Sequence, residues 1–225
     1  MTERAAPAKR GSLSREMVIT AALARVDRHG LDSLSMRELA HDLGVGAMSL
    51  YRHVHDKDEL LELITDRVID GFLPEPAEVP WPEQAARICR QVRAGLLAHP
   101  DLATHALRRP VNASATGLRV NGQMVAMLLG SGLPRDAAPN VYWVLSLYAM
   151  GFSQFEIERQ RAVGGRPHHK SEERRRNLAA LVAVFDVDVP DTDALAAVLS
   201  VDFGDEQFEF GLAAVILGLE ASVGR

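Results

Sequence analysis

The stretch from residue 33 to residue 57, SLSMRELAHDLGVGAMSLYRHVHDK, predicts two short helices joined by a tight turn. Ser35 stands three residues before Glu38, the spacing of a capping box, so we expect the first helix to begin directly after Ser35. Gly44 should end that helix, because a residue without a Cβ atom readily adopts the left-handed conformation of a helix stop. A second helix is expected to run as far as Val54.

An apolar residue, a small residue and a turn glycine at this spacing are typical of a helix-turn-helix, in which Ala40 lets the second helix approach the first closely. The outer face of the second helix mixes small, hydroxyl, aromatic and basic groups, with no carboxylate between Gly46 and His55. Such a face can lie against phosphates without repelling them. The hairpin by itself leaves a second interpretation open, an αα-hairpin that only packs a core.

The flanking residues carry a resemblance to a known family. They are the first helix REMVITAALARVDRHG, the link LDSLSMRELAHDLGV, the helix GAMSLYRHV and the following DKDELLELI. From Ser14 to Phe72 the chain resembles the DNA-binding domain of the tetracycline-repressor family of bacterial transcriptional regulators. The resemblance implies an all-α fold and a homodimer that binds a palindromic operator on double-stranded DNA. It also implies release from the operator by a small-molecule effector, and most members of the family are repressors.

The resemblance also implies which side chains contact DNA. Arg37 matches the family's guanine-reading arginine. The start of the second helix faces bases, and two of its three residues are apolar, so contact with thymine methyl groups is expected there. Arg52 stands where the tetracycline repressor has an aromatic residue, and it could grip either a phosphate or a base. Tyr51 could instead belong to the core, and Lys57 to the solvated surface. The predicted DNA-contacting residues are Ser35, Arg37, Ala47, Met48, Ser49, Tyr51, Arg52, His53 and Lys57.

Charge neither supports nor excludes a nucleic-acid partner. The net charge of the chain is −5, and residues 1–72 hold ten Lys and Arg against twelve Asp and Glu. A nucleic-acid-binding domain is usually basic. Five of the acids fall within residues 58–72, however, so the face that reads DNA can be positive if these acids point away from it.

The composition and the pattern of apolar residues predict an all-α chain, because Ala and Leu dominate and no alternating apolar runs occur. The segment PEPAEVPWP (74–82) carries four prolines and marks a domain boundary. We therefore expect a disordered basic arm over 1–12, a helix-turn-helix domain over 13–57, a linking helix over 58–73 and a larger helical domain over 74–225. The first helix should run from Arg15 to His29, and helices beyond the boundary are expected near 83–99, 102–107, 115–129, 135–159, 174–185 and 205–220.

The larger domain is expected to hold a ligand and to form the dimer. The family pairs two C-terminal helices in a four-helix bundle, which here would be 135–159 and 205–220, although both could also bury their apolar faces within one subunit. HALRRP (105–110) resembles the segment in which the tetracycline repressor places a magnesium-binding histidine, but Arg108 replaces the hydroxyl residue there. Candidate ligand residues, each of which could also be plain core, are His105, Met124, Met127, Trp143, Leu147, Met150 and Phe152.

Other function classes find less support in the sequence. It has no nucleophile elbow, P-loop, HExxH or CxxC motif, so an enzyme is not expected, and neither a metal nor another cofactor is predicted. The single Cys89 excludes an intrachain disulfide and fits the reducing cytoplasm. The longest uncharged stretch, 137–155, contains proline and polar residues, which indicates a core helix rather than a membrane span. The remaining alternative is an architectural DNA-binding protein without an effector.

Overall fold

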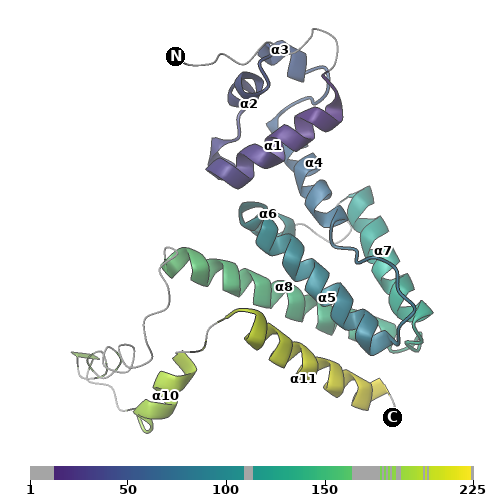
Figure 1. Ribbon diagram of the computed structural model, residues 1–225, viewed down its shortest axis with the longest axis vertical. Helices are drawn as coiled ribbons and strands as arrows, with labels where there is room; N and C mark the ends of the chain where they lie inside the picture. Colours follow the sequence, from purple (N-terminus) through teal and green to yellow (C-terminus); the bar gives the residue numbers. More distant parts are fainter. Residues whose placement is uncertain are drawn as a thin grey trace, which may run out of the picture. The chain divides into compact units, whose positions relative to one another are not determined.

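The computed structural model describes residues 13–108 and 114–163, and beyond them residues 189–199, 201 and 203–223 with scattered positions between 178 and 185. Its described residues form helices and no strand, which confirms the predicted all-α fold (Figure 1). The chain divides into two compact units, residues 1–150 and residues 151–225. The predicted arm over 1–12 lies outside the described residues.

Helix α1 (Arg15–His29) begins and ends where its caps predict. The Ser14 hydroxyl accepts a hydrogen bond from the backbone N–H of Met17 at 3.2 Å, which satisfies a free donor of the first turn. Gly30 ends the helix with φ at 79°, a backbone conformation that residues with a Cβ atom rarely adopt. The apolar stripe of α1 is buried, and its members are Val18, Ile19, Ala22 and Val26.

Helix α2 (Met36–Asp42) follows the short 3-10 turn η1 (Leu31–Ser33) and is also capped as predicted. The Ser35 hydroxyl accepts from the N–H of Glu38 at 3.2 Å. At the other end Gly44 has φ at 64°, its N–H donates to the His41 carbonyl, and the N–H of Val45 donates to the Ala40 carbonyl at 3.0 Å. These two bonds form a Schellman motif, so the turn of the helix-turn-helix is fixed by the backbone.

Helix α3 (Ala47–Leu50) is shorter than the sequence predicts. The chain continues as a turn over residues 51–53, where the N–H groups of His53 and Val54 both donate to the Leu50 carbonyl, at 2.8 and 3.1 Å. This tightened last turn lets the chain reach Asp56, which caps the next helix with an extended backbone. A helical side-chain pattern does not distinguish such a turn from a further turn of α-helix, so the predicted end at Val54 was wrong.

Arg25 of α1 holds the helix-turn-helix together. Its guanidinium donates to the carbonyl of Ser33 at 2.9 Å, to Asp42 at 2.6 Å and to Glu38 at 3.2 Å. Its side chain is only 11% exposed, so these bonds are better shielded from water than an ordinary surface ion pair. The hydrogen bond from Arg25 also lowers the pKa of Asp42 below its usual value of 3.8.

Replacing Arg25 by methionine should therefore destabilise the fold. We expect a loss of about 1–2 kcal/mol in the free energy of unfolding near neutral pH, because two carboxylates and one carbonyl lose their donor. A carboxyl with a lowered pKa stabilises the fold above its unfolded pKa and stops doing so as the pH falls through its folded pKa. The difference between the two proteins should then shrink below about pH 4 in urea titrations. A difference that is independent of pH would contradict this role of Asp42.

Helix α4 (Lys57–Asp70) leads from the helix-turn-helix to the next helices. The carboxylate of Asp56 accepts from the N–H of Glu59 at 2.8 Å, and the Glu59 side chain accepts from the N–H of His55 at 2.6 Å. Inward-facing Leu60, Ile64 and Val68 are buried. Helices α1 and α4 are also joined by ion pairs of Arg15 with Glu59 and of Arg67 with Glu16.

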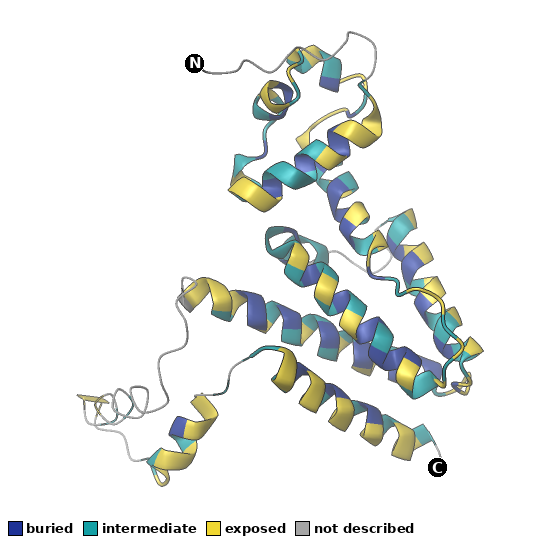
Figure 2. Cartoon of the chain, viewed as in Figure 1, coloured by how far each residue is buried: buried dark blue, intermediate teal, exposed yellow. Residues whose placement is uncertain are grey.

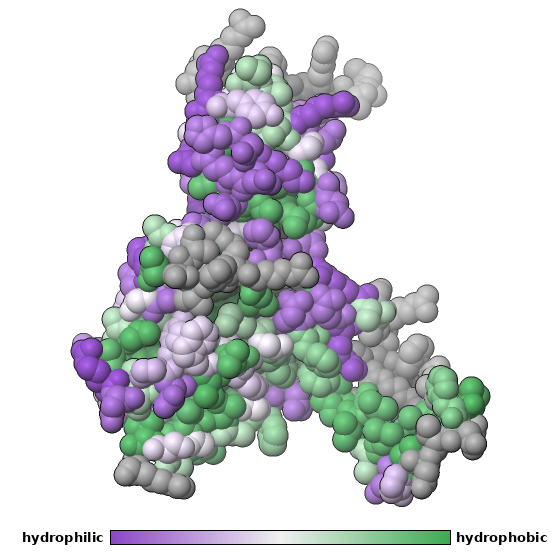
Figure 3. Space-filling view, turned by 180° about the vertical axis from the view of Figure 1, so that it is seen from behind, coloured by the Kyte–Doolittle hydropathy of each residue, from purple (hydrophilic) through white to green (hydrophobic). Residues whose placement is uncertain are grey.

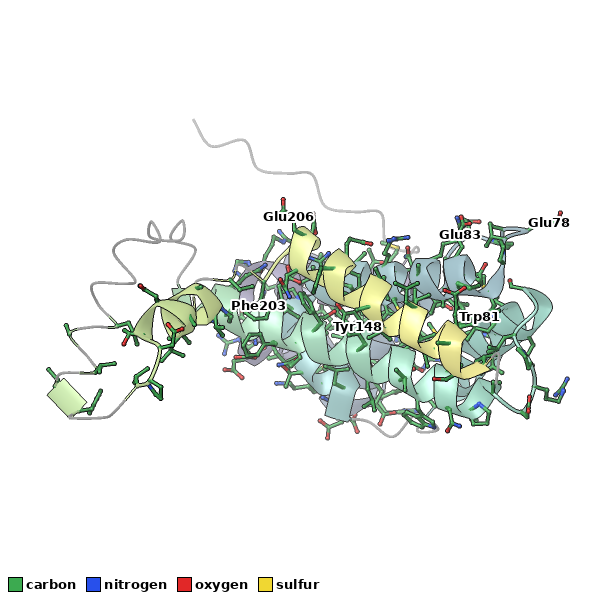
Figure 4. The ribbon with its side chains drawn as sticks, turned by 90° about the horizontal axis from the view of Figure 1, so that it is seen from below. Glu78, Trp81, Glu83, Tyr148, Phe203 and Glu206 are labelled. Carbon is green, nitrogen blue, oxygen red and sulfur yellow. The ribbon has the colours of Figure 1, made fainter. Side chains whose placement is uncertain are left out.

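Beyond the proline-rich segment the chain continues with α5 (Trp81–Ala98), α6 (Pro100–Arg108), α7 (Ala115–Gly130) and α8 (Ala138–Val163). Glu78 precedes α5, whose first turn carries Trp81 and Glu83 (Figure 4). Within residues 1–150, α4 packs against α6 and α7, and α5 packs against α6 and α7. Phe72, just after α4, lies against Gly95 of α5 so closely that a Cβ atom on Gly95 would come within 2.8 Å of its ring.

Replacing Gly95 by alanine should accordingly displace the Phe72 ring. The ring is 8% exposed and cannot swing into solvent without losing its burial, so we expect destabilisation of about 1–3 kcal/mol, the usual cost of overpacking a core. Thermal unfolding of the variant tests this prediction. The second variant Gly95→Ala/Phe72→Leu should recover part of the loss, and equal stability of Gly95→Ala and the parent protein would refute the close contact.

The unit formed by residues 151–225 contains the end of α8 together with α10 (Thr192–Leu199) and α11 (Asp205–Val223). The Phe203 ring, just before α11, lies 4.6 Å from that of Phe155 and 5.9 Å from that of Phe152 (Figure 4). Phe152 also contacts Phe208 of α11 at 5.3 Å. These aromatic contacts form the core between α8 and α11 in this unit.

Helix α10 is absent from the helices predicted from the sequence, because an Asp-rich segment such as this one is also typical of a turn. Asp191 accepts from the N–H of Ala194 at 2.8 Å and so caps the helix. The same residue types serve turns and helix N-caps, and this explains the error. None of the described helices combines the length and the apolar character that crossing a membrane requires.

Candidate functional site

The predicted DNA-contacting side chains are accessible on α2, on α3 and on the turn after it. Arg37, Met48, Tyr51, Arg52 and Lys57 are exposed, and Met48 reaches 77%. Half-buried positions are Ser35, Ala47, Ser49 and His53. From residue 46 to residue 53 only Leu50 is buried, and it anchors α3 in the core. The second helix of the hairpin therefore has a free outer face.

The charges around this face are distributed unevenly. Glu38 and Asp42 are paired with Arg25, Glu59 with Arg15, and Glu16 with Arg67. Two acids near the end of α4 also have partners in α7, since Ser114 donates to Asp66 at 2.8 Å and Arg119 pairs with Asp70. Six of the twelve acids within residues 1–72 are thus tied to cations or to a hydroxyl.

In contrast to these acids, the three cations of the predicted DNA-binding surface form no ion pair within the part of the chain that the structure describes. Among the described residues, Arg37, Arg52 and Lys57 have no ion-pair partner, and all three are exposed. Asp58 and Glu62 of α4 are also exposed. A phosphate that approaches α2 and α3 would therefore meet unpaired positive charge without first breaking an internal salt bridge. Figure 3 shows the end of the chain that holds the helix-turn-helix as mainly hydrophilic.

A second candidate site is a cavity of about 310 Å³ within residues 1–150. Five helices or their ends enclose it. Helix α5 contributes Ile88, Cys89 and Val92, and α7 contributes chiefly Val120, Met124 and Leu128. Helix α8 lines a further side with residues from Tyr142 to Met150. The volume lies at the lower end of the range for small-molecule sites, and most of the lining is apolar.

A small polar cluster interrupts the apolar wall of the cavity. The Tyr142 hydroxyl donates to Oδ1 of Asn121, and Nδ2 of Asn121 donates to the carbonyl of Gly117 at 2.7 Å. A hydrogen bond with Ser146 also reaches the Tyr142 side chain. Burial raises the pKa of Tyr142, and the bond with Ser146 opposes this only in part, so the residue remains a neutral phenol at physiological pH.

The structure brings four of the seven predicted ligand residues together. Met124, Trp143, Leu147 and Met150 all line the cavity. His105 and Met127 are half-buried residues that do not line it, and Phe152 belongs to the aromatic core with Phe203 and Phe208. Sequence reasoning overlooked Asn121 and Tyr142. Two hydrogen-bonding residues within otherwise apolar helical stretches were the signal that could have found them.

The cavity is connected to the helix-turn-helix through two elements. Ile69 of α4 and the following Phe72 line it, and α4 is bonded to α7 by Asp66 and Asp70 as described above. Ala106 and Leu107 of α6 also line it. Directly before α6, Nδ1 of His99 lies 2.9 Å from a carboxylate oxygen of Asp27 in α1. Both α4 and α6 therefore contribute to the lining of the cavity and also contact α1 of the helix-turn-helix domain.

The structure offers no evident place for a metal ion. Within the part of the chain that it describes, no three His, Cys, Asp or Glu side chains converge as ligands of one ion would. Cys89 is buried, and its thiol faces the carbonyl of Leu145 at 3.8 Å.

Comparison with known proteins identifies the family. Residues 18–64 match the family model for bacterial regulatory proteins of the tetR family, and residues 73–223 match that for the tetracyclin repressor-like C-terminal domain. An HTH-type transcriptional regulator of Saccharopolyspora erythraea is 30% identical over 215 residues, which cover 94% of this chain and 86% of that protein. The HTH-type transcriptional repressor DrrR1 of Streptomyces coeruleorubidus is 29% identical over 224 residues, 95% of this chain and 80% of that protein.

A solved structure agrees with the sequence relatives. The crystal structure of the Streptomyces coelicolor TetR family protein ActR in complex with actinorhodin matches with a TM-score of 0.73 and 32% identity. The match covers 96% of this chain and 100% of that one. Both halves of the chain, the helix-turn-helix and the larger helical part, therefore have counterparts in one family. The chain belongs to the tetracycline-repressor (TetR) family of bacterial transcriptional regulators.

Proposed function

We propose that this protein is a dimeric repressor that binds a palindromic operator and leaves it when a small molecule occupies the cavity. The observation that supports DNA binding most directly is the exposure of Arg37 on α2, Arg52 after α3 and Lys57 at the start of α4. Among the described residues these three cations have no ion-pair partner, whereas the acids Glu38 and Asp42 of α2 are paired with Arg25. The repressor DrrR1 and the ligand-bound ActR structure among the relatives support repression and effector binding. Arg37 would read guanine, and Met48 thymine methyl groups.

The proposed division of labour follows the chain. Residues 13–57 would bind DNA, residues 58–73 would link, and residues 74–225 would hold the effector and the dimer contact. The function would be exercised in the cytoplasm, where bacterial DNA lies, and by binding rather than by catalysis. An effector-independent architectural role finds less support, because a cavity of about 310 Å³ borders the linking helix.

Dimerisation is inferred from apolar surface that a monomer would leave in water. Helix α11 buries Phe208, Leu212 and Ile216 along one side, as Figure 2 shows, yet Phe210 and Leu217 on the same helix are 72% and 66% exposed. Phe155 of α8 is also exposed. Large exposed apolar residues that recur about two helical turns apart, as Phe210 and Leu217 do, are typical of protein–protein contacts. A two-fold dimer would carry two reading heads and could bind two half-sites about one helical turn of DNA apart.

Release by an effector would run through α4. A ligand that fits only one arrangement of Ile69, Phe72 and the α7 contacts would shift α4 and thereby change the spacing of the two heads. A coupling free energy of about 1–3 kcal/mol would alter operator affinity roughly 5- to 150-fold. Thermodynamic reciprocity requires operator to weaken ligand binding by the same factor, so equal ligand affinities with and without operator would exclude the coupling.

Selection of bound DNA from a random pool, at a stated salt concentration, tests the function. The proposal predicts enrichment of a palindrome whose half-sites lie about one helical turn apart. A reporter gene placed behind that palindrome should be silenced by the protein in a bacterial host. Recovery of DNA without a common sequence would favour the architectural alternative, and failure to retain any DNA would exclude both.

A further inference from the structure

The part of the cavity wall that the structure describes carries no formal charge. Every described residue that lines it is apolar or neutral, and the hydroxyl of Ser114, which lines it, donates a hydrogen bond to Asp66. The lining includes the flexible side chains of Met124 and Met150, which adapt to ligands of different outline. A carboxylate or ammonium group placed here would lose its water without gaining an opposite charge, which is strongly unfavourable.

One end of the cavity offers a hydrogen bond. The chain from Tyr142 through Asn121 to the carbonyl of Gly117 fixes both side chains. The proton of the Tyr142 hydroxyl is used in this chain and Ser146 also bonds to the Tyr142 side chain, whereas Oδ1 of Asn121 can accept a further hydrogen bond. Because burial keeps Tyr142 neutral, the end of the cavity stays an uncharged acceptor at physiological pH.

The cavity opens to solvent beside α8. Trp143 and Leu147 line the cavity and yet are 48% and 65% exposed, so they stand at its mouth. The indole of Trp143 lies edge-on to the ring of Tyr142, with 5.6 Å between the ring centroids. A planar apolar molecule entering past Trp143 would therefore meet aromatic surface first and the polar cluster deeper inside.

We propose that the cavity selects an uncharged, mainly apolar molecule that donates one hydrogen bond to the Tyr142–Asn121 pair, and that it rejects organic anions and cations of similar size. This rests on the proposed function in one respect, that the cavity is the effector site. The chemical class follows from the wall, whatever the natural ligand is.

Two dyes that share one skeleton test the selectivity. N-phenyl-1-naphthylamine is neutral with one N–H donor, and 8-anilino-1-naphthalenesulfonate adds an anionic sulfonate to the same frame. Each is titrated into the full-length protein while the dye emission and the quenching of Trp143, one of two tryptophans in the chain, are followed. Met124→Trp fills the cavity, and Leu118→Trp is the matched control, since Leu118 lies on the same helix but is 58% exposed and does not line the cavity.

The neutral dye should bind at one site per chain, with at least about ten-fold higher affinity than the sulfonate. Met124→Trp should abolish that site, and Leu118→Trp should leave it intact. Should Met124→Trp fail to fold, as judged by circular dichroism, the double variant Tyr142→Phe/Asn121→Leu serves instead. It should weaken binding of the neutral dye by about 3- to 10-fold, because the acceptor is lost.

Comparable affinity of the two dyes at the site that Met124→Trp removes would overturn the proposal, and so would neutral-dye binding that neither cavity variant affects. Operator binding is measured on the same samples to keep the two hypotheses apart. If the neutral dye binds selectively but operator affinity does not change, the ligand class stands and effector release fails. If operator is bound normally while the sulfonate binds as tightly as the neutral dye, the ligand class fails and the DNA-binding function stands.

Discussion

Replacing Arg37 by alanine should weaken binding to the palindromic operator by about 1–3 kcal/mol for each half-site, because one bidentate contact to guanine disappears from each reading head. Over two half-sites this corresponds to a loss of affinity of roughly 30-fold to more than 10⁴-fold. Arg37 is exposed and has no ion-pair partner among the described residues, so its removal should leave the stability of the fold nearly unchanged. Titration of labelled operator at fixed salt measures the loss.

Arg135→Ala is the matched control for Arg37→Ala. Arg135 is likewise exposed, but it lies between α7 and α8 and takes no part in the α2–α3 face, so the variant removes the same charge elsewhere. Operator variants complete the test. Arg37→Ala should relax the preference at one base of each half-site, whereas Arg135→Ala should change neither affinity nor preference. Unaltered selectivity of Arg37→Ala would show that this arginine does not read a base.

The double variant Phe210→Asp/Leu217→Asp should convert the protein into a monomer. The two side chains are the most exposed large apolar residues of α11, and carboxylates there would repel their counterparts across a two-fold contact. A monomer engages one half-site only, so operator affinity should fall by about 10²- to 10⁴-fold through the loss of avidity. Sedimentation and operator titration of the same sample measure both effects.

Leu118→Asp provides the control for this charge reversal. Leu118 of α7 is 58% exposed, close to the 66% of Leu217. The variant places the same carboxylate on a helix outside the proposed dimer contact. The control should remain dimeric and should bind operator like the parent. If Phe210→Asp/Leu217→Asp also stays dimeric, the dimer must form through other surfaces, such as the apolar one over α10 (Figure 3) that includes Val198 and Leu199.

Features encoded by neighbouring residues were predictable from the sequence. The bounds of α1 agree with the prediction because Ser14 and Gly30 act on the backbone within a few residues of themselves. The turn at Gly44 is local in the same way. Helix α10 was missed because Asp191 carries the same local signal whether it opens a helix or a turn.

Features that depend on distant contacts were not predictable. Charge counted from the sequence left DNA binding open, because the sequence does not show that Arg25 pairs with Asp42, 17 residues away, or that Arg67 pairs with Glu16, 51 residues away. Asn121 and Tyr142 are separated by 21 residues and meet only because α7 and α8 both border the cavity. The size of their side chains was enough to predict Met124, Trp143, Leu147 and Met150 as cavity residues. Size could not show that Phe152 lies elsewhere, with its ring packed on Phe203 and Phe208.

The most direct test of DNA binding by the exposed cations is the salt dependence of operator binding, measured for the parent protein and for Lys57→Gln. Each phosphate contact contributes about one unit to the slope of log affinity against log salt concentration. Each dimer has one Lys57 in each of its two DNA-binding domains. Two chains of the variant should therefore still bind each operator, and the slope should be smaller by about two than that of the parent protein. Binding of a single parent chain to each operator would contradict a DNA contact that this face makes twice in each dimer. A slope that Lys57→Gln leaves unchanged would contradict it too.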